Sequence, residues 1–199
     1  MNRLVIAVLL LGALGSAHAA GSASAGQGKA AVCSACHGMD GNSVMPLWPN
    51  LAGQHEQFIS KQLMDFKSGV RKDDTMTAMA APLSDQDVAD LAAWYASQKA
   101  TIGSANAEKA APGEQLYRAG DASKGLAACM ACHGPNGAGN PAAKFPALGG
   151  QHAAYTVKAL KDFRDGKRSN DPANMMRDVA AKMSDAQIEA VAEYIAGLH

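Results

Sequence analysis

The sequence predicts an all-α protein made of two tandem copies of one helical unit. Three observations support this fold class. A five-residue pattern, C-x-x-C-H, occurs twice and heads two stretches that align with each other. Downstream of each pattern, apolar residues recur at the spacing of a helix face, followed by glycine stops and serine caps. Little of the chain shows the alternation that is typical of a half-buried strand.

The first 19 residues have the composition of a cleaved signal peptide. Arg3 supplies a positive charge, residues 4–14 are apolar, and a small-x-small cleavage pattern ends at Ala19. The apolar run is short for a membrane-spanning helix; an uncleaved N-terminal anchor is the alternative. We therefore expect a cleaved signal peptide at residues 1–19 and export to an oxidising compartment.

The charge distribution argues against a nucleic-acid partner. The chain has 18 basic and 18 acidic residues. Residues 20–98 carry five basic and eight acidic side chains, whereas residues 112–199 carry ten basic and nine acidic ones. No basic patch interleaved with aromatic residues is present, as nucleic-acid binding would require. A mildly acidic half joined to a mildly basic half instead suggests an electric dipole that orients docking.

Each C-x-x-C-H pattern is typical of a covalent attachment site for c-type haem. The patterns comprise Cys33, Cys36 and His37 in the first copy, and Cys129, Cys132 and His133 in the second. Two thiols three positions apart can each bond one vinyl group of a porphyrin, and the adjoining histidine then ligates the iron. The two patterns use all four cysteines of the chain. The sequence therefore predicts two covalent haem c groups.

Other uses of the cysteines fit less well. Paired zinc-ribbon motifs lie about 15–20 residues apart, whereas the gap here runs from His37 to Cys129. A thioredoxin-like C-x-x-C needs a βαβ setting. Two disulfides within the motifs would leave both histidines unexplained.

The two copies align well beyond the motifs. Residues 49–55 (PNLAGQH) match residues 146–152 (PALGGQH), and Ser84 matches Ser184. The offset grows from 96 at the cysteines to 100 at the serines, which small insertions in the second copy explain. Each copy is small for a self-sufficient core, so a buried haem would supply the missing apolar mass.

These matches define the expected domain organisation. We expect one domain at residues 20–98 and another at residues 112–199. The segment 99–111, rich in Ala, Gly, Ser and Lys, is expected to be a linker. The alternative is that part of it is helical, because residues 107–111 have good helix propensity.

Two helices are expected in the downstream part of each copy. The first has an apolar face and a glycine stop: Phe58, Ile59, Leu63, Phe66 and Gly69 in one copy, Tyr155, Leu160, Phe163 and Gly166 in the other. The last helices are expected to begin at Ser84 and Ser184. Gln187 completes a capping box with Ser184, and Asp87 forms a weaker version with Ser84.

The repeat also selects the sixth iron ligand. Aligning Ser84 on Ser184 places Met76 on Met176, and no other methionine pair downstream of the motifs falls in register. A thioether opposite the histidine would close the iron to substrates and raise its potential relative to bis-histidine ligation. We expect Met76 and Met176 to be the axial ligands, with Met79 and Met175 as the alternates.

Two further histidines, His55 and His152, recur in both copies and could be mistaken for ligands. We interpret each as a residue at a helix start whose imidazole hydrogen-bonds a nearby group. The carbonyls of Pro49 and Pro146 are better candidates for a supporting role, since they could accept from the proximal imidazole Nδ1–H.

The arginines at 71 and 168 also align. Arg71 and Arg168 could pair with haem propionates. A solvated helix end is an equally good interpretation of both.

Together these residues resemble the cytochrome c4 family, which are periplasmic dihaem cytochromes. The features are the signal peptide, the paired C-x-x-C-H and Gly-Gln-His, the loops of Met76 and Met176, and the C-terminal residues 194–199 (YIAGLH). The resemblance implies two class I cytochrome c-like domains, each wrapped around a covalent haem, that face each other with the haems near their interface. It implies electron transfer from a quinol-oxidising complex (quinol–cytochrome c oxidoreductase) to a terminal haem–copper oxidase.

The expected function is a soluble periplasmic electron carrier with no substrate of its own, and a monomer. One alternative is the electron-accepting dihaem subunit of a dehydrogenase such as a flavocytochrome. Another is a dihaem peroxidase, against which the methionines in register argue because a peroxidase needs an open distal position. The sequence leaves open a peripheral association with the membrane surface.

Overall fold

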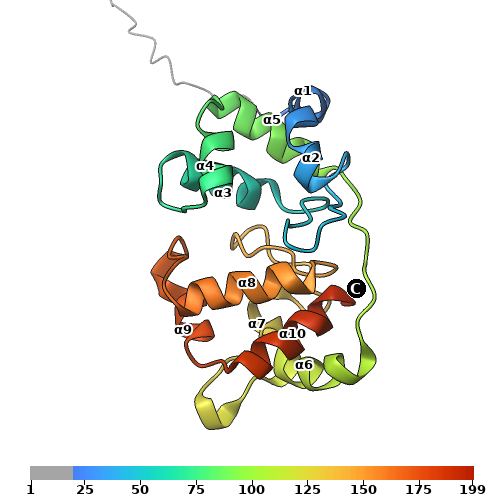
Figure 1. Ribbon diagram of the computed structural model, residues 1–199, viewed down its shortest axis with the longest axis vertical. Coiled ribbons are helices and arrows are strands. Elements are labelled where there is room, and N and C mark those ends of the chain that lie inside the picture. Colours follow the sequence, from blue (N-terminus) through green and yellow to red (C-terminus); the bar gives the residue numbers. More distant parts are fainter. Residues whose placement is uncertain (1–19) are drawn as a thin grey trace, which may run out of the picture.

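The computed structural model describes residues 20–199, and within them the secondary structure is helical apart from two isolated β-bridges. The predicted signal peptide at residues 1–19 lies outside the described residues. The helices form two groups stacked one above the other, joined by an extended segment along one side (Figure 1). The all-α prediction is confirmed.

The first group contains helices α1 to α5. Their bounds are α1 Ala23–Lys29, α2 Ser34–His37, α3 Glu56–Lys67, α4 Asp74–Ala80 and α5 Asp85–Ala96, with a 3₁₀ turn η1 at Ala30–Val32. Helix α5 lies at the centre, packed against α1 and α3, and α4 packs on α3. The buried side chains of this group include Ala30, Ile59, Leu91, Ala92 and Tyr95.

The second group repeats the arrangement. Its helices are α6 Ala107–Ala119, α7 Met130–His133, α8 Ala153–Arg164, α9 Met175–Ala180 and α10 Asp185–Ala196, with 3₁₀ turns η2 Ala122–Lys124 and η3 Pro172–Asn174. Helix α10 packs against α6 and α8, and α9 packs on α8. The apolar cluster of this group includes Leu116, Tyr117, Leu160, Ile188, Val191 and Ile195.

The predicted helix signals correspond to observed ends. Gly69 and Gly166 follow α3 and α8 with φ of 75° and 71°, a left-handed conformation that glycine adopts at little cost. Ser84 and Ser184 cap α5 and α10, and both helices have a complete capping box. The box of Ser84 and Asp87, expected to be the weaker one, therefore has the same two hydrogen bonds as the box of Ser184 and Gln187.

Helix α6 begins at Ala107, inside the segment expected to be a linker. The Asn106 side chain caps it by accepting from the backbone N–H of Glu108 and Lys109. The helical alternative therefore holds for residues 107–111, and the non-helical connection is limited to the stretch before them.

Two glycines allow the first helix of each group to cross the last one closely. A Cβ on Gly26 of α1 would lie 2.0 Å from the Asp90 carbonyl oxygen, and one on Gly113 of α6 would lie 2.0 Å from the Ala190 carbonyl oxygen. Such distances are far below a van der Waals contact. The crossings α1–α5 and α6–α10 therefore require residues without a side chain.

This close approach predicts a position-specific effect on stability. Gly26→Ala forces α1 away from α5 and is expected to lower the free energy of unfolding by about 1–3 kcal/mol. Gly28→Ala on the same helix is the matched control, because its Cβ would meet no atom within 4 Å. That control is expected to gain about 1 kcal/mol from helix propensity. Denaturant unfolding measures both, and equal effects of the two substitutions would contradict the crossing argument.

Candidate haem sites and the interface between them

Each C-x-x-C-H pattern forms one short helical turn. Cys33 is the N-cap of α2 and Cys129 is the N-cap of α7. Each turn ends at a glycine with positive φ, Gly38 at 80° and Gly134 at 78°. All four thiols are free of disulfides. Both sulfurs of a motif and its histidine therefore come from a single turn of backbone.

The two motif histidines are held in one orientation. His37 and His133 are each 7% exposed. The His37 Nδ1 lies 2.9 Å from the Pro49 carbonyl oxygen, and the His133 Nδ1 lies 3.0 Å from that of Pro146. A carbonyl only accepts, so Nδ1 carries the hydrogen and Nε2 is left for a metal. The expected role of the two prolyl carbonyls is confirmed.

The electrostatic environment keeps these imidazoles neutral, which is the form that ligates metals. Burial lowers the pKa of His37 and of His133, and the hydrogen bond to the prolyl carbonyl offsets only part of that effect. Burial also raises the pKa of the Cys33 thiol, and that of Cys129 to about 11. Both thiols are therefore poor thiolate ligands for a bare metal ion.

The predicted axial methionines lie in the first turns of two equivalent short helices, α4 and α9, rather than in the loops expected from the sequence. In α4 the Asp73 carboxylate accepts from the Met76 backbone N–H at 3.0 Å, and in α9 the Asp171 carboxylate accepts from that of Met176 at 3.0 Å. Both methionines are half-buried. Met176 packs against the same apolar cluster as Cys129. Each aspartate thus fixes the turn that carries the thioether.

The alternate methionines are more exposed. Met79 is 37% exposed and Met175 is 41% exposed.

The structure also accounts for the change in the offset between the two copies from 97 to 100 across this region, because η3 adds residues before α9. Two residues of η3, Ala173 and Asn174, have left-handed φ of 50° and 60°.

The donor atoms suit an iron held in a porphyrin. The described residues contain no cluster of three or more His, Cys, Asp or Glu side chains that could hold a bare ion. Each motif brings two thiols and one imidazole nitrogen together within a single helical turn. These groups match a covalently attached haem whose iron is ligated by the histidine.

The two groups of helices are joined by hydrogen bonds that repeat in both directions. The Gln54 side chain pairs with the backbone N–H and C=O of Ala147 at 3.0 and 2.9 Å. The Gln151 side chain pairs with those of Asn50 at 2.9 and 3.0 Å. The Asn50 side chain adds a bond to the Gly150 carbonyl at 2.9 Å. The interface is therefore polar and nearly two-fold symmetric.

The recurring histidines belong to this interface. The His55 Nε2 lies 2.9 Å from the Ala138 carbonyl oxygen, and the His152 Nε2 lies 2.9 Å from that of Ser43. His55 and His152 are the N-cap residues of α3 and α8. As expected from the sequence, each imidazole hydrogen-bonds a neighbouring group at a helix start.

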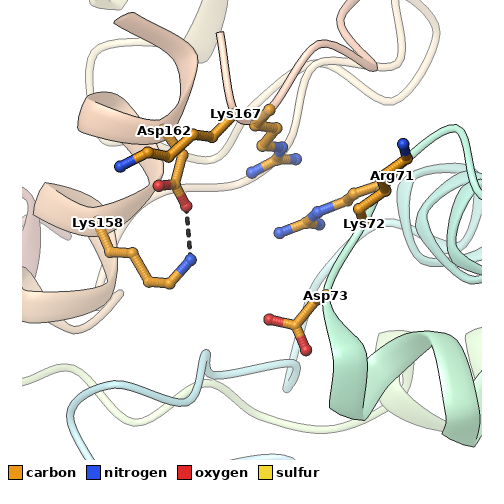
Figure 2. Close-up of a pocket in the computed structure, with 7 residues that line it drawn as sticks. Arg71, Lys72, Asp73, Lys158, Asp162 and Lys167 are labelled. Carbon is orange, nitrogen blue, oxygen red and sulfur yellow. Dashed lines mark hydrogen bonds and ion pairs between the residues drawn. The ribbon is translucent and has the colours of Figure 1, made fainter. Parts of the chain in front are cut away.

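A cationic pocket lies beside the interface. Figure 2 shows Arg71, Lys72 and Asp73 of the first group facing Lys158, Asp162 and Lys167 of the second. Its cavity volume is about 210 Å³, and five of its seven lining residues are basic. Such a pocket favours an anionic occupant.

The two aligned arginines are packed in this region rather than solvated. The Arg71 guanidinium lies over the Phe66 ring and donates to Gln62 and to the Tyr155 hydroxyl. Arg168 lies over the Phe163 ring. Burial and the neighbouring Arg71 lower the pKa of Arg168 to about 10. The interpretation of these arginines as solvated helix ends is therefore wrong.

The tyrosine between the arginines responds to their charge. Burial raises the pKa of Tyr155, but the positive charges of Arg71 and Arg168 outweigh it and lower the pKa to about 8. The two arginines thus favour the ionised form of the Tyr155 hydroxyl.

The role of the interface glutamines was not predicted. Gly-Gln-His recurs in both copies, and that repetition is the signal that could have drawn attention to Gln54 and Gln151. Their partners lie 93 and 101 residues away.

None of the helices in residues 20–199 is both long and apolar enough to cross a membrane.

Comparison with known proteins agrees with this geometry. The cytochrome c family model matches residues 23–99 and again residues 110–199. The chain is therefore a c-type cytochrome with two cytochrome c domains, and its two C-x-x-C motifs carry two covalent haem c groups.

Longer matches give the particular family. Cytochrome c4 of Stutzerimonas stutzeri is 54% identical over 210 residues, covering 100% of both chains. The crystal structure of reduced recombinant cytochrome c4 from Pseudomonas stutzeri superposes with a TM-score of 0.88 at 54% identity, covering 90% of this chain and 100% of that one. The thiosulfate dehydrogenase electron acceptor of Thiomonas intermedia is 44% identical over 198 residues, covering 98% of this chain and 90% of that protein. The chain belongs to the cytochrome c4 family.

Proposed function

We propose that this dihaem cytochrome is a periplasmic electron carrier that takes electrons from a quinol-oxidising complex and delivers them to a terminal haem–copper oxidase. The observation that carries the proposal is the pair of equivalent sites, each with a buried, oriented histidine and a methionine on a capped helix. An electron-carrying site needs an iron that is closed to substrates rather than one with an open catalytic position.

The proposed ligand set follows from these sites. Thioether bonds form at Cys33, Cys36, Cys129 and Cys132, and the axial ligands are His37 with Met76 and His133 with Met176. Domains at residues 20–98 and 112–199 each hold one haem. The half-buried positions of Met76 and Met176, against the more exposed Met79 and Met175, support this assignment.

The chain's own residues set the conditions for electron transfer. When bound, each haem supplies an iron that changes reversibly by one electron. The histidine is held by a prolyl carbonyl, so its orientation stays fixed as the charge on the metal changes. The methionine would supply a second protein ligand to each iron, which would leave no position open to a substrate and would raise the potential. Arg71 and Arg168 supply positive charge at the interface, where haem propionates would be paired.

A second candidate function is supported by one specific relative. The thiosulfate dehydrogenase electron acceptor of Thiomonas intermedia is 44% identical and matches nearly the whole chain. In that function the donor is a dehydrogenase rather than a quinol-oxidising complex. Its two haem sites would need the same ligands, so the donor has to be identified by experiment.

Three measurements on the purified holoprotein test the proposal. Carbon monoxide added to the reduced protein is expected to leave the absorption spectrum unchanged, because both irons are closed. The reduced protein is expected to be oxidised by membranes that contain a haem–copper oxidase, with matching oxygen uptake. Rapid carbon monoxide binding would contradict the closed sites. Reduction by a thiosulfate dehydrogenase with thiosulfate, without oxidation by the membranes, would favour the second function.

A further inference from the structure

Each motif histidine, His37 or His133, is hydrogen-bonded to a peptide group that also makes a hydrogen bond to the opposite domain. The Pro49 carbonyl accepts from His37 Nδ1 at 2.9 Å, and the N–H of the same peptide group, that of Asn50, donates to Gln151 Oε1 at 2.9 Å. Two hydrogen bonds and one peptide group therefore connect the first histidine to the second domain.

The second site has the equivalent hydrogen-bonded connection, which runs from the second domain to the first. The Pro146 carbonyl accepts from His133 Nδ1 at 3.0 Å, and the Ala147 N–H of that peptide group donates to Gln54 Oε1 at 3.0 Å. Each glutamine therefore lies in one domain and is linked to the iron ligand of the other.

The glutamine side chains are fixed by their remaining bonds. Gln54 is 7% exposed, its Nε2 donates to the Ala147 carbonyl at 2.9 Å, and its Oε1 also accepts from the His55 N–H at 3.0 Å. Gln151 makes the equivalent bonds to the Asn50 carbonyl and the His152 N–H, both at 3.0 Å. Since Oε1 faces two N–H donors in each case, the amide orientation is determined by its partners.

Hydrogen bonds through one peptide unit strengthen one another. When the N–H donates to a good acceptor, the carbonyl of that unit becomes more negative and accepts more strongly. A stronger bond to Nδ1–H makes the imidazole a more basic ligand. A more basic ligand favours the oxidised iron and lowers the potential of its haem.

We propose that Gln54 and Gln151 are positioning residues that act across the interface: Gln54 lowers the potential of the second haem, and Gln151 lowers that of the first. The proposal rests on the axial roles of His37 and His133 in the proposed function. It makes the domain interface part of each iron's environment, so a motion that separates the domains would raise both potentials together.

The test uses paired substitutions in the full-length holoprotein. Gln54→Met and Gln151→Met keep the side-chain length and remove the acceptor. Gln54→Asn and Gln151→Asn keep an amide but are one methylene too short to reach the partner backbone, and they provide the test if the apolar variants assemble poorly. His55→Phe is the matched control, because it removes one hydrogen bond across the interface without touching either linked peptide group.

The readout is a potentiometric titration of each haem separately. NMR signals of the two axial methionine methyl groups, assigned with Met76→Ala and Met176→Ala, report the oxidation state of each iron. Substitution of Gln54 is expected to raise only the second potential, and substitution of Gln151 only the first. The His55→Phe control is expected to leave both unchanged.

Three results would overturn the inference: a shift confined to the haem of the mutated domain, equal shifts of both haems, or no shift in either glutamine variant. These results are distinguishable from a failure of the proposed function. If the wild-type protein lacks two low-spin haems with methionine ligation, the ligand assignment itself is wrong. If that spectrum is present and the crossed shifts are absent, only the inference about the glutamines fails.

Discussion

Met76→Ala is expected to convert the first haem alone to a high-spin or water-ligated form, and Met176→Ala to do the same to the second. Loss of the thioether leaves the iron with one strong protein ligand, so its distal position opens. The potential of that haem is expected to fall by a sizeable part of the roughly 0.8 V range over which axial ligands set haem potentials. The other haem keeps its low-spin spectrum because its ligands come entirely from the other domain.

The controls are the two alternate methionines. Met79→Ala and Met175→Ala remove more exposed side chains and are expected to preserve the weak near-infrared absorption that accompanies methionine ligation. Absorption spectra of the oxidised variants measure this directly. Loss of that band in Met79→Ala or Met175→Ala, with retention in Met76→Ala or Met176→Ala, would show that the alignment of the repeats selected the wrong residue.

Replacing both cysteines of the second motif, Cys129→Ala with Cys132→Ala, is expected to abolish the second haem and to lower the melting temperature of the second domain. The apolar cluster of that domain has nine buried residues, and Cys129 and Met176 pack at its border. A domain of this size has little apolar surface to bury by itself. The haem would fill the rest of the core, so its loss would leave a cavity beside the apolar cluster.

Mass spectrometry under denaturing conditions and far-ultraviolet circular dichroism measure the two parts of this prediction. The variant is expected to carry one haem mass instead of two and to lose the helical signal of α6 to α10 at lower temperature than the wild type. The corresponding pair in the first domain, Cys33→Ala with Cys36→Ala, is the matched comparison. A second domain that melts cooperatively at the wild-type temperature without its haem would contradict the role of the cofactor in the core.

The helices that carry short-range signals could be predicted from the sequence. The α3, α8, α5 and α10 helices have apolar faces together with glycine stops or serine caps, and these signals depend only on near neighbours. The α1 and α6 helices were missed, apart from the propensity of residues 107–111. Their defining feature is the close crossing at Gly26 and Gly113, which depends on a partner helix more than sixty residues away.

The repeat could not reveal that crossing either. The two glycines are 87 positions apart, whereas the motif cysteines are 96 apart, because the second copy has extra residues between its first helix and its motif. Those residues include η2 and the bridge between Asp121 and Leu126. An alignment anchored on the cysteines therefore does not place Gly113 opposite Gly26.

The haem motifs were predictable because the reaction with a porphyrin requires a fixed spacing within one helical turn. The supporting carbonyls of Pro49 and Pro146 were also predictable, since they recur at nearly the same distance after each histidine. The links from those peptide groups to Gln54 and Gln151 were not, because they depend on how the two domains face each other. Local sequence carries no information about which donor a side-chain amide will meet across an interface.

The central claim is that one chain carries two closed, low-spin haems with histidine and methionine ligands that exchange electrons reversibly. A spectroscopic redox titration of the purified protein, with the haem content per chain counted on the same sample, tests it most directly. The account predicts two haems per chain and two reversible one-electron steps, each accompanied by gain or loss of the methionine-ligation band. A single haem, or a step in which one iron becomes high-spin on reduction and binds carbon monoxide, would contradict it.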